Sequence, residues 1–283
     1  MVNREKLAAV FFAAAMVLGL AATAGAADGT IEINQAKVLA SGGFPYVISA
    51  TASYRLTGNL TVPGSTDGID VTAANVTIDL NGFAITTASG LVGIKVSEGL
   101  YTVENGTVNG FSTGGVEGGF FGIVKNLHAD GNGQFGINVG DHTVVEGCTA
   151  NLNASPSGVG IVCFSGCAIS GNTASQNIAD GIDCTGTGCV ISSNAAYLNS
   201  KVGINCSGSG CAISGNTAAS NGSSGISCGG SGCLVSGNAV SGNALGISAH
   251  DTTTGYGGNV LMNTTNHSGG TSLGHNLCSG IVC

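Results

Sequence analysis

The sequence has few charged residues and very few basic ones. Lysine and arginine number 7 in the 283 residues, against 15 acidic residues, and only 8% of the chain is charged. This balance argues against nucleic acid or an anionic membrane as a partner, because both bind proteins mainly through clustered lysine and arginine. It also argues against a large polyanionic substrate, unless a local basic site or bridging cations are present. Most of the surface must therefore be Ser, Thr, Asn and Gly.

The sequence also lacks an apolar run long enough to span a bilayer. The run Leu7–Leu20 follows Arg4 and Lys6 and precedes Ala24-Gly25-Ala26. A basic start, an apolar segment shorter than a spanning helix needs and a small-residue cleavage site together predict a secretory signal peptide. We assign residues 1–26 to it. The mature chain is expected to have no transmembrane segment and to be periplasmic, extracellular or on the cell surface.

Helical spacing of apolar residues is absent from the most regular part of the chain, residues 181–243. Three copies of a 22-residue unit follow one another there, opening with Gly-Ile at Gly181, Gly203 and Gly225. Apolar residues alternate within each copy, which predicts short strands. A repeated unit of this length, built from strands and Gly/Asn/Ser turns, is typical of a solenoid. One unit has a single apolar face, so it is stable only when stacked on its copies.

The Gly-Ile or Gly-Val anchor recurs along most of the chain, in steps of 21 to 25 residues. The anchors are Gly68, Gly93, Gly115, Gly136, Gly160, Gly181, Gly203, Gly225 and Gly246. We therefore expect about nine to ten coils, with the repeats in residues 68–251. An N-terminal cap and the first strands are expected in residues 27–67, where Ile33–Ala40 could form one or two helical turns. Residues 252–283 are expected to close the other end.

Consecutive strands in such a stack are parallel, and connections between parallel strands are overwhelmingly right-handed. With its G-I-x-C/V and I-S-x-N motifs and the later Asn of each copy, the sequence resembles the right-handed parallel β-helix repeat proteins. These are the scaffold of pectate lyases, polygalacturonases and mannuronan epimerases. The resemblance covers roughly residues 68–251 and implies an all-β, single-stranded right-handed parallel β-helix. The sequence has no R-I-K, D-P-H-D or N-T-D motif, so no catalytic residue carries over from these enzymes.

Asparagine recurs at two positions of the coil. One column contains Asn126, Asn172, Asn194, Asn216 and Asn238, and the other contains Asn132, Asn153, Asn177, Asn199, Asn221 and Asn243. Asparagine tolerates the left-handed backbone that sharp corners need, and its side-chain amide can donate to a carbonyl of the next coil. We interpret both columns as structural.

All 11 cysteines lie after residue 147, which suits an oxidising compartment and a structural use. Ten of them form pairs of similar spacing: Cys163/Cys167, Cys184/Cys189, Cys206/Cys211, Cys228/Cys233 and Cys278/Cys283. Disulfides could close a coil or join neighbouring coils, and the spacing does not choose between these pairings. A ladder of buried thiols and a metal site are the alternatives. We expect disulfides and no metal, because no His lies between Phe164 and Ala249.

The eleventh cysteine, Cys148, falls in the first Asn column. A small buried residue fits there, and no cationic neighbour in the sequence would activate its thiol. We therefore expect Cys148 to be structural.

The residue after each Gly-Ile or Gly-Val points outward, so stacked coils place these side chains in one column. Near the N-terminal end this column contains Asp70, Lys95 and Glu117. Lyases and hydrolases of the resembled scaffold keep their sites on an exposed strand face, so these residues are the catalytic candidates. The alternative is a cross-strand charge ladder that stabilises the sheet.

The motif D-G-I-D occurs at Asp67–Asp70 and again at Asp180–Asp183. Asp180 and Asp183 are candidate ligand-binding residues, because two neighbouring carboxylates could bind calcium or act as acid and base. Five coils separate the two motifs, so they are not expected to form one site. No cofactor other than calcium is suggested by the sequence.

Aromatic residues, whose faces can stack on sugars, concentrate in the N-terminal half. They are Phe83, Tyr101, Phe111, Phe120, Phe121 and Phe135. Two functions are therefore carried forward. The first is an exported β-helix with a structural, surface or ligand-binding role and no catalysis. The alternative is a lyase- or hydrolase-like protein that binds or degrades extracellular or cell-wall polysaccharide on the outward face of the N-terminal coils.

Overall fold

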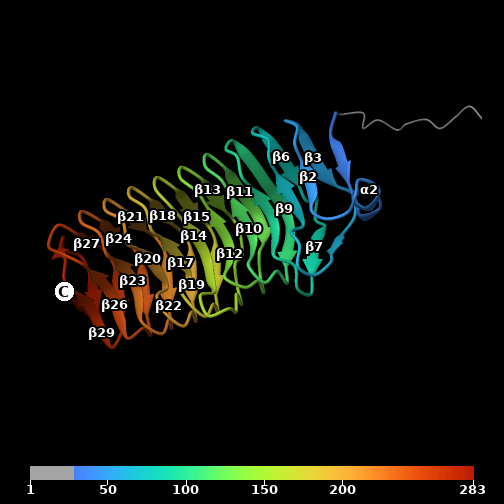
Figure 1. Cartoon of the computed structure of the whole chain (residues 1–283). Helices are drawn as coiled ribbons and strands as arrows, with labels where there is room; N and C mark the ends of the chain where they lie inside the picture. The colour runs from blue at the N-terminus through green and yellow to red at the C-terminus, as the bar shows by residue number, and fades with distance from the viewer. Residues whose placement is uncertain (1–28) are drawn as a thin grey trace, which may run out of the picture. The chain divides into compact units, whose positions relative to one another are not determined.

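The computed structural model describes residues 29–283, so the predicted signal peptide lies outside the described residues. The unit from Ile31 to Cys283 consists of short strands and one short helix, α2 (Gln35–Ala40). Its strands form coils that stack along one axis, with α2 at the N-terminal end (Figure 1). No helix among residues 29–283 is long and apolar enough to cross a membrane.

The strands belong to three sheets; successive coils add strands to sheets 1 and 2, and sheet 3 begins at β16 (Thr173–Ser175). Sheet 1 comprises β1 (Ile31–Ile33), β3 (Ser53–Leu56), β4 (Leu60–Val62), β6 (Val76–Asp79), β7 (Ala84–Thr87), β9 (Tyr101–Asn109), β11 (Ile123–His128), β13 (Val144–Glu146), β15 (Ala168–Ser170), β18 (Val190–Ser192), β21 (Ala212–Ser214), β24 (Leu234–Ser236), β27 (Gly255–Gly257) and β30 (Thr271–Ser272). Sheet 2 comprises β2 (Tyr46–Ile48), β5 (Ile69–Val71), β8 (Val92–Val96), β10 (Gly114–Gly118), β12 (Phe135–Val139), β14 (Val159–Cys163), β17 (Ile182–Cys184), β20 (Ile204–Cys206), β23 (Ser224–Cys228), β26 (Leu245–Ala249) and β29 (Thr265–Ser268). Sheet 3 comprises β16 (Thr173–Ser175), β19 (Ala195–Tyr197), β22 (Thr217–Ala219), β25 (Ala239–Ser241), β28 (Val260–Met262), β31 (Leu277–Cys278) and β32 (Ile281–Val282).

The predicted parallel β-helix is confirmed, and the number of coils is slightly larger than predicted. Sheet 2 has 11 strands, and its order follows the chain from β2 to β29. The nine anchors account for the strands from β5 to β26. The two additional strands, Tyr46–Ile48 and Thr265–Ser268, stack in register on β5 and β26 without a Gly-Ile anchor. Backbone pairing at the two ends of the stack therefore does not require the anchor.

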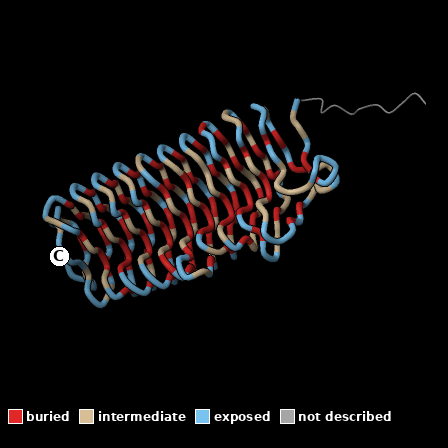
Figure 2. Tube along the Cα trace, in the orientation of Figure 1, coloured by how far each residue is buried: buried red, intermediate tan, exposed pale blue. Residues whose placement is uncertain are grey.

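The core is a set of parallel columns of side chains, one residue per coil. Ile182, Ile204 and Ile226 lie directly opposite one another on β17, β20 and β23, and all are fully buried. Figure 2 shows an alternation of buried and exposed residues that repeats along the stack up to its C-terminal end, where exposed residues predominate. The anchor glycine is needed because backbones approach closely there. A Cβ on Gly203 would lie 2.6 Å from the carbonyl oxygen of Gly225 and 2.6 Å from the Asn221 amide nitrogen.

Asparagine side chains form hydrogen-bonded ladders inside the stack. The backbone N–H and the side-chain amide of Asn194 both donate to Oδ1 of Asn216, at 2.9 and 3.0 Å. The same amide donates to the carbonyl of Ile169 in the preceding coil, at 2.9 Å. A second ladder repeats these bonds, for example from Asn199 to Asn221 at 3.1 and 3.0 Å. Each buried amide is thus bonded to coils on both sides, so the ladders hold the coils in register.

The prediction for these columns was wrong in one respect. The left-handed backbone does not lie at the ladder asparagines but at the residue before each, as in Ser193 (φ 57°) and Leu198 (φ 56°). Asn126 (φ 52°) occupies this preceding corner position, so it does not belong to the first ladder. Cys148 does belong to it, because its N–H donates to Oδ1 of Asn172 at 2.8 Å.

Helix α2 lies within the segment that was predicted to form one or two helical turns. Asn34 caps it, and its side chain accepts a hydrogen bond from the Lys37 N–H at 3.0 Å. Val38 is the buried residue of the helix, and it packs into the same core as the first coils. The helix therefore contributes an apolar side chain to the N-terminal end of the stack.

We predict that Asn216→Ala destabilises the fold by about 3 kcal/mol, because it leaves the Asn194 N–H and the Ile191 carbonyl buried without their partner. Ser214→Ala, two residues away on the outward face of β21, is the matched control and should change stability by less than about 0.5 kcal/mol. Urea-unfolding midpoints measure both. Equal losses in the two variants would contradict a structural role for the ladder.

Candidate functional site

Strands β5, β8 and β10 bring the three catalytic candidates side by side. Asp70 lies opposite Lys95, and Lys95 lies opposite Glu117, in the parallel register of sheet 2. Each side chain points outward because the residues on either side of it, such as Ile94 and Val96, are buried. We call this row of side chains the sheet-2 column. It continues through Asn138, Val162, Asp183, Asn205, Ser227 and Ser248.

The charges of the sheet-2 column interact weakly. Lys95 Nζ lies 4.0 Å from a carboxylate oxygen of Glu117, and both side chains are about 40% exposed, so solvent screens this pair. The surroundings of Asp70 disfavour its charged form. Burial raises its pKa, and the nearby carboxylate of Asp67 raises it further, whereas Lys95 lowers it. Oδ1 of Asp70 is buried and accepts no hydrogen bond from any described residue.

An apolar pocket of about 460 Å³ lies at the carboxyl ends of the same three strands. Ala74 in the turn after β5, Glu98 to Leu100 after β8, and Phe120 and Phe121 after β10 line it. The two Phe rings meet edge to face, with their centroids 5.6 Å apart, and both are about half exposed. Lys95 and Glu98 are three residues apart, which is ~10 Å of extended chain. The charged column and the apolar pocket are therefore adjacent.

The structure separates the aromatic residues that the sequence grouped together. Tyr101, Phe111 and Phe135 are buried in the stack, and Phe83 packs against the core. Phe120 and Phe121 are the members of the group that are exposed, so they remain available to a ligand.

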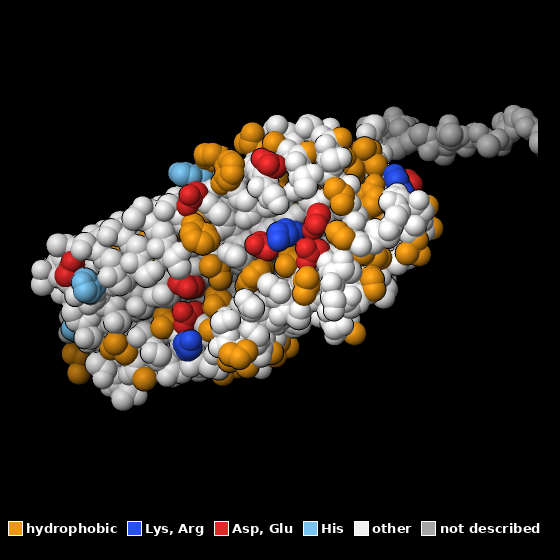
Figure 3. Space-filling model, viewed as in Figure 1, with side chains coloured by type: hydrophobic (Ala, Val, Ile, Leu, Met, Phe, Trp, Pro, Cys, Tyr) orange, Lys and Arg blue, Asp and Glu red, His pale blue; other side chains and the backbone are white. Residues whose placement is uncertain are grey.

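Asp180 and Asp183, the candidate ligand-binding residues, lie further along sheet 2. Their carboxylates accept hydrogen bonds from the Val202 N–H at 2.8 Å and from the Asn205 amide at 2.9 Å. Burial raises the pKa of both groups. The two D-G-I-D motifs lie at β5 and β17, with four strands of sheet 2 between them, so their carboxylates cannot belong to one site. On the face seen in Figure 3, acidic and basic side chains also gather in two places along the stack.

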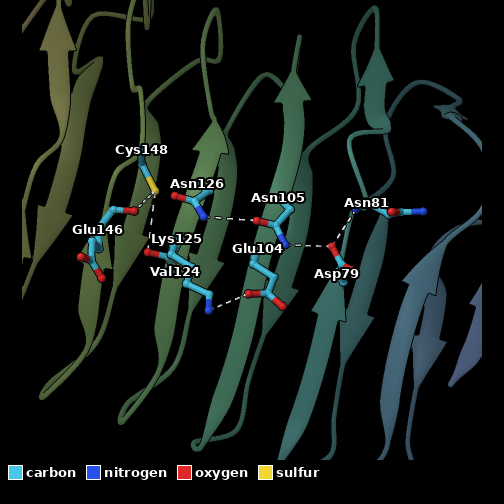
Figure 4. Close-up of polar contacts among 9 residues, drawn as sticks. All are labelled: Asp79, Asn81, Glu104, Asn105, Val124, Lys125, Asn126, Glu146 and Cys148. Atoms are coloured by element: carbon cyan, nitrogen blue, oxygen red, sulfur yellow. Dashed lines mark hydrogen bonds and ion pairs between the residues drawn. The ribbon is translucent and has the colours of Figure 1, made fainter. Parts of the chain in front are cut away.

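A second charged column, on sheet 1, was missed in the sequence. Its members, one per coil in register, are Glu32, Arg55, Asp79, Glu104, Lys125 and Glu146. Lys125 Nζ lies 2.9 Å from Glu104, and the Asn105 amide donates to Asp79 at 3.1 Å (Figure 4). The steps from Asp79 to Glu146 are 25, 21 and 21 residues, which match the repeat, so the same counting could have found them. Its charges pair with one another, which favours a role in strand pairing.

The cysteines use both kinds of pairing that the sequence left open. Cys163–Cys184 joins neighbouring coils, whereas Cys206–Cys211, Cys228–Cys233 and Cys278–Cys283 close single turns. Cys167 and Cys189, which were disulfide candidates, are buried free thiols. Cys148 is also a buried thiol, and its sulfur lies 3.3 Å from the Glu146 carbonyl and 3.7 Å from the Val124 carbonyl (Figure 4). Burial raises the Cys148 pKa to about 11, in keeping with its expected structural role.

Two carboxylates whose pKa values shift in opposite directions, those of Asp183 and Asp251, predict opposite pH responses in two variants. Folding raises the Asp183 pKa, so the stability that its protonated form contributes is present below the ordinary pKa of ~4 and is lost as the pH rises through the folded value. Asp183→Asn keeps an acceptor for Asn205 and carries no charge. We expect it to be more stable than the wild type at pH 7 and to lose this advantage below pH ~4.

Asp251 is the matched comparison. Hydrogen bonds from Thr253 and Ser231 lower its pKa to about 2, so the stability that its carboxylate contributes is present above ~4 and lost as the pH falls toward the folded value. Asp251→Asn should therefore be less stable than the wild type at pH 7, with a difference that fades in acid. Urea midpoints between pH 2 and pH 8, a range set by these ~2–4 titrations, measure both. A shift in the same direction for both variants would contradict this account.

The fold is similar to several solved β-helical structures, all at low sequence identity. The A-module of mannuronan C-5 epimerase AlgE4 from Azotobacter vinelandii has a TM-score of 0.62 at 16% identity, over 84% of this chain and 85% of that one. Pectate lyase Pel9A has a TM-score of 0.60 at 17% identity, over 89% and 76%. The Dettilon tailspike protein has a TM-score of 0.61 at 17% identity over 86% of this chain, which spans 58% of the tailspike chain. These similarities concern the fold alone.

Sequence comparison is more specific about the family. No curated protein matches the chain. The sequence model of one family, described as "Periplasmic copper-binding protein (NosD)", matches residues 122–272, which is more than half of the chain. The matched residues run from the turn before β11 to β30, and so include most of the stacked coils. The chain therefore belongs to the NosD family.

Proposed function

We propose that the protein is a non-catalytic binding scaffold outside the cytoplasm that holds an uncharged glycan across β5, β8 and β10. One observation carries this proposal: the same three coils supply both the charged residues Asp70, Lys95 and Glu117 and the apolar pocket beside them. A sugar needs both kinds of surface, because its ring has apolar C–H faces and a polar rim of hydroxyl groups.

The two parts of the site suit different parts of a sugar. The half-exposed ring of Phe120 can pack against C–H groups, beside Phe121, which itself stacks on His142 with the ring centroids 5.1 Å apart. The carboxylates of Asp70 and Glu117 can accept hydrogen bonds from hydroxyl groups, to which the Lys95 ammonium can donate. The fold repeats at a strand spacing of ~4.8 Å, so a linear polymer can follow the column from one coil to the next.

The charge of the site favours an uncharged glycan. The column and the pocket beside it contain four carboxylates, those of Asp67, Asp70, Glu98 and Glu117, and one ammonium, that of Lys95, which gives a formal charge of −3 (4 acidic minus 1 basic). An acidic polysaccharide would be repelled by this charge, unless bridging cations such as calcium neutralised it. We therefore infer a neutral cell-wall or extracellular polysaccharide as the partner and no resident cofactor at this site.

Hydrolysis is the alternative for the same site. Asp70 and Glu117 are two strands apart, or ~9.6 Å along the sheet, which is close to the upper limit for the two carboxyl groups of an inverting glycosidase. The raised pKa of Asp70 would suit a general acid. Lys95, however, lies between the two carboxylates and pairs with Glu117, in the position that a scissile bond and its water would have to occupy. This crowding favours binding without cleavage.

The site of action that we propose is the periplasm. The family description names periplasmic proteins, and the Cys163–Cys184, Cys206–Cys211, Cys228–Cys233 and Cys278–Cys283 disulfides suit an oxidising compartment. The predicted signal peptide is consistent with export to it.

Copper, named in the family description, is a second ligand that we propose, and the donor atoms fit one oxidation state. Two groups of three potential ligand atoms lie within 4.8 Å of one another in residues 29–283, and both consist of cysteines alone. Thiolates are soft ligands that favour Cu(I), whereas Cu(II) favours nitrogen and oxygen ligands in a tetragonal arrangement. Five of these six cysteines are disulfide-bonded, so only Cys189 among them offers a thiol, and it is this thiol, with the free Cys167 of the preceding coil, that fits Cu(I).

The glycan site predicts a difference between two equally exposed Phe residues. Phe120→Ala should weaken binding of a neutral oligosaccharide by about 1 kcal/mol, or roughly fivefold, through loss of its stacking face. Phe164→Ala, at a turn of a later coil outside the pocket, is the matched control and should leave affinity unchanged. Calorimetric titration, after a screen of neutral and acidic glycans, measures both affinities.

The carboxylates provide the second arm of the same experiment. Asp70→Asn with Glu117→Gln should weaken binding of the neutral glycan and leave the folded structure intact. If no glycan binds the wild type, or if the double variant changes only stability, the glycan proposal fails. Release of shortened products by the wild type would replace binding by hydrolysis as the function of the site.

A further inference from the structure

Cys167 and Cys189 form a pair of buried thiols that no disulfide uses. They occupy the same position in neighbouring coils, because the following residues, Ala168 and Val190, lie opposite each other and the Val190 N–H donates to the Cys167 carbonyl at 2.9 Å. Each thiol donates a hydrogen bond to a backbone carbonyl, Cys167 to Gly140 at 3.3 Å and Cys189 to Phe164 at 2.8 Å. The side chains are 1% and 0% exposed. Two soft donor atoms therefore lie at matching positions of neighbouring coils inside the stack.

We propose that Cys167 and Cys189 bind one Cu(I) ion through their two sulfurs. This inference names the residues for the copper binding proposed above and rests on it, but it is independent of the glycan site. Two sulfur ligands suffice for Cu(I), which accepts low coordination numbers, whereas a structural Zn²⁺ site needs four ligands. The dithiol should therefore discriminate between these two ions.

The arrangement of disulfides explains why the thiol pair exists at this place in the stack. In the two later coils, Cys206–Cys211 and Cys228–Cys233 consume both sulfurs of each coil. Here Cys163 is bonded across coils to Cys184, which leaves the second cysteine of each coil reduced. Cys189 Sγ lies within 4.8 Å of both sulfurs of that disulfide, so reduction of the disulfide would add two further donors to the pair.

Proton and charge balance define the form in which the ion would be held. Metal ligands are thiolates rather than thiols, so in the binding step the S–H bonds of Cys167 and Cys189 break, two S–Cu bonds form and two protons are released to solvent. The two thiolates and the Cu(I) ion then carry a net charge of −1. Burying this charge costs less than burying two thiolates without the cation.

The pair lies one backbone layer below the surface. Cys189 Sγ is 2.8 Å from the carbonyl oxygen of Phe164, and Cys167 Sγ is 3.3 Å from that of Gly140; both carbonyls belong to turns that follow sheet-2 strands. Phe164 is half exposed at one of these turns. An ion can therefore reach the sulfurs when a turn is displaced, without separation of the coils.

The test is a Cu(I) titration of the full-length mature protein, purified without reductant and handled anaerobically, against a chromophoric Cu(I) chelator. Thiols counted in denaturant should number three, those of Cys148, Cys167 and Cys189. The wild type should retain one equivalent of Cu(I). Cys167→Ser and Cys189→Ser should each lose more than the ~10–100-fold in affinity that removal of an outer-shell partner costs. Cys148→Ser, which removes a buried thiol that has no sulfur neighbour on its own coil, is the matched control and should retain the ion.

Protection from alkylation provides a readout that needs no variant. Bound Cu(I) should protect Cys167 and Cys189, but not Cys148, from N-ethylmaleimide in partly opened protein, as read by peptide mass spectrometry. A count of one thiol would mean that Cys167 and Cys189 are oxidised to a disulfide and would overturn the assignment. Cu(I) retained by Cys167→Ser/Cys189→Ser would also overturn it, while leaving copper binding elsewhere in the chain intact. No Cu(I) retained by the wild type would end both copper proposals.

Discussion

The structure depends on one constraint: the apolar layer of each coil can be removed from water only by the coils on either side of it. The Ile182, Ile204 and Ile226 column meets this requirement through direct stacking. The asparagine ladders meet the corresponding requirement for polar groups, because each buried amide bonds to both neighbouring coils. Apolar burial and hydrogen bonding therefore impose the same register, and a shift of one residue would disrupt both.

The same register determines how a function can arise on this scaffold. Stacking aligns outward residues as strictly as inward ones, so a single substitution per coil builds a continuous surface column. In the N-terminal coils the sheet-2 column contains Asp70, Lys95 and Glu117, and the adjoining turns supply the apolar pocket. In the later coils the column changes to Asn205, Ser227 and Ser248, which bear no charge. The surface that we propose for glycan binding is thus confined to part of a uniform stack.

The pairing of the cysteines, by contrast, is not uniform along the stack. Stacking brings the sulfurs of neighbouring coils as close together as those of one coil, so pairings within a coil and across coils compete. Cys206–Cys211 and Cys163–Cys184 represent the two outcomes. Neighbouring coils of similar sequence therefore differ in which cysteines are free thiols and which are disulfide-bonded. Each disulfide determines which sulfurs remain available to the next coil.

Local sequence was sufficient to predict the parallel stack, its nine Gly-anchored coils and the juxtaposition of Asp70, Lys95 and Glu117, because these follow from a repeat whose length is written in the chain. It could not predict the coils formed by Tyr46–Ile48 and Thr265–Ser268, which pair through the backbone and bear no anchor. Nor could it distinguish Asn126 at a left-handed corner from Asn194 in a ladder, or free Cys189 from bonded Cys184. Those outcomes depend on contacts between coils, and a side chain's partners one coil away exist only once the coils are stacked.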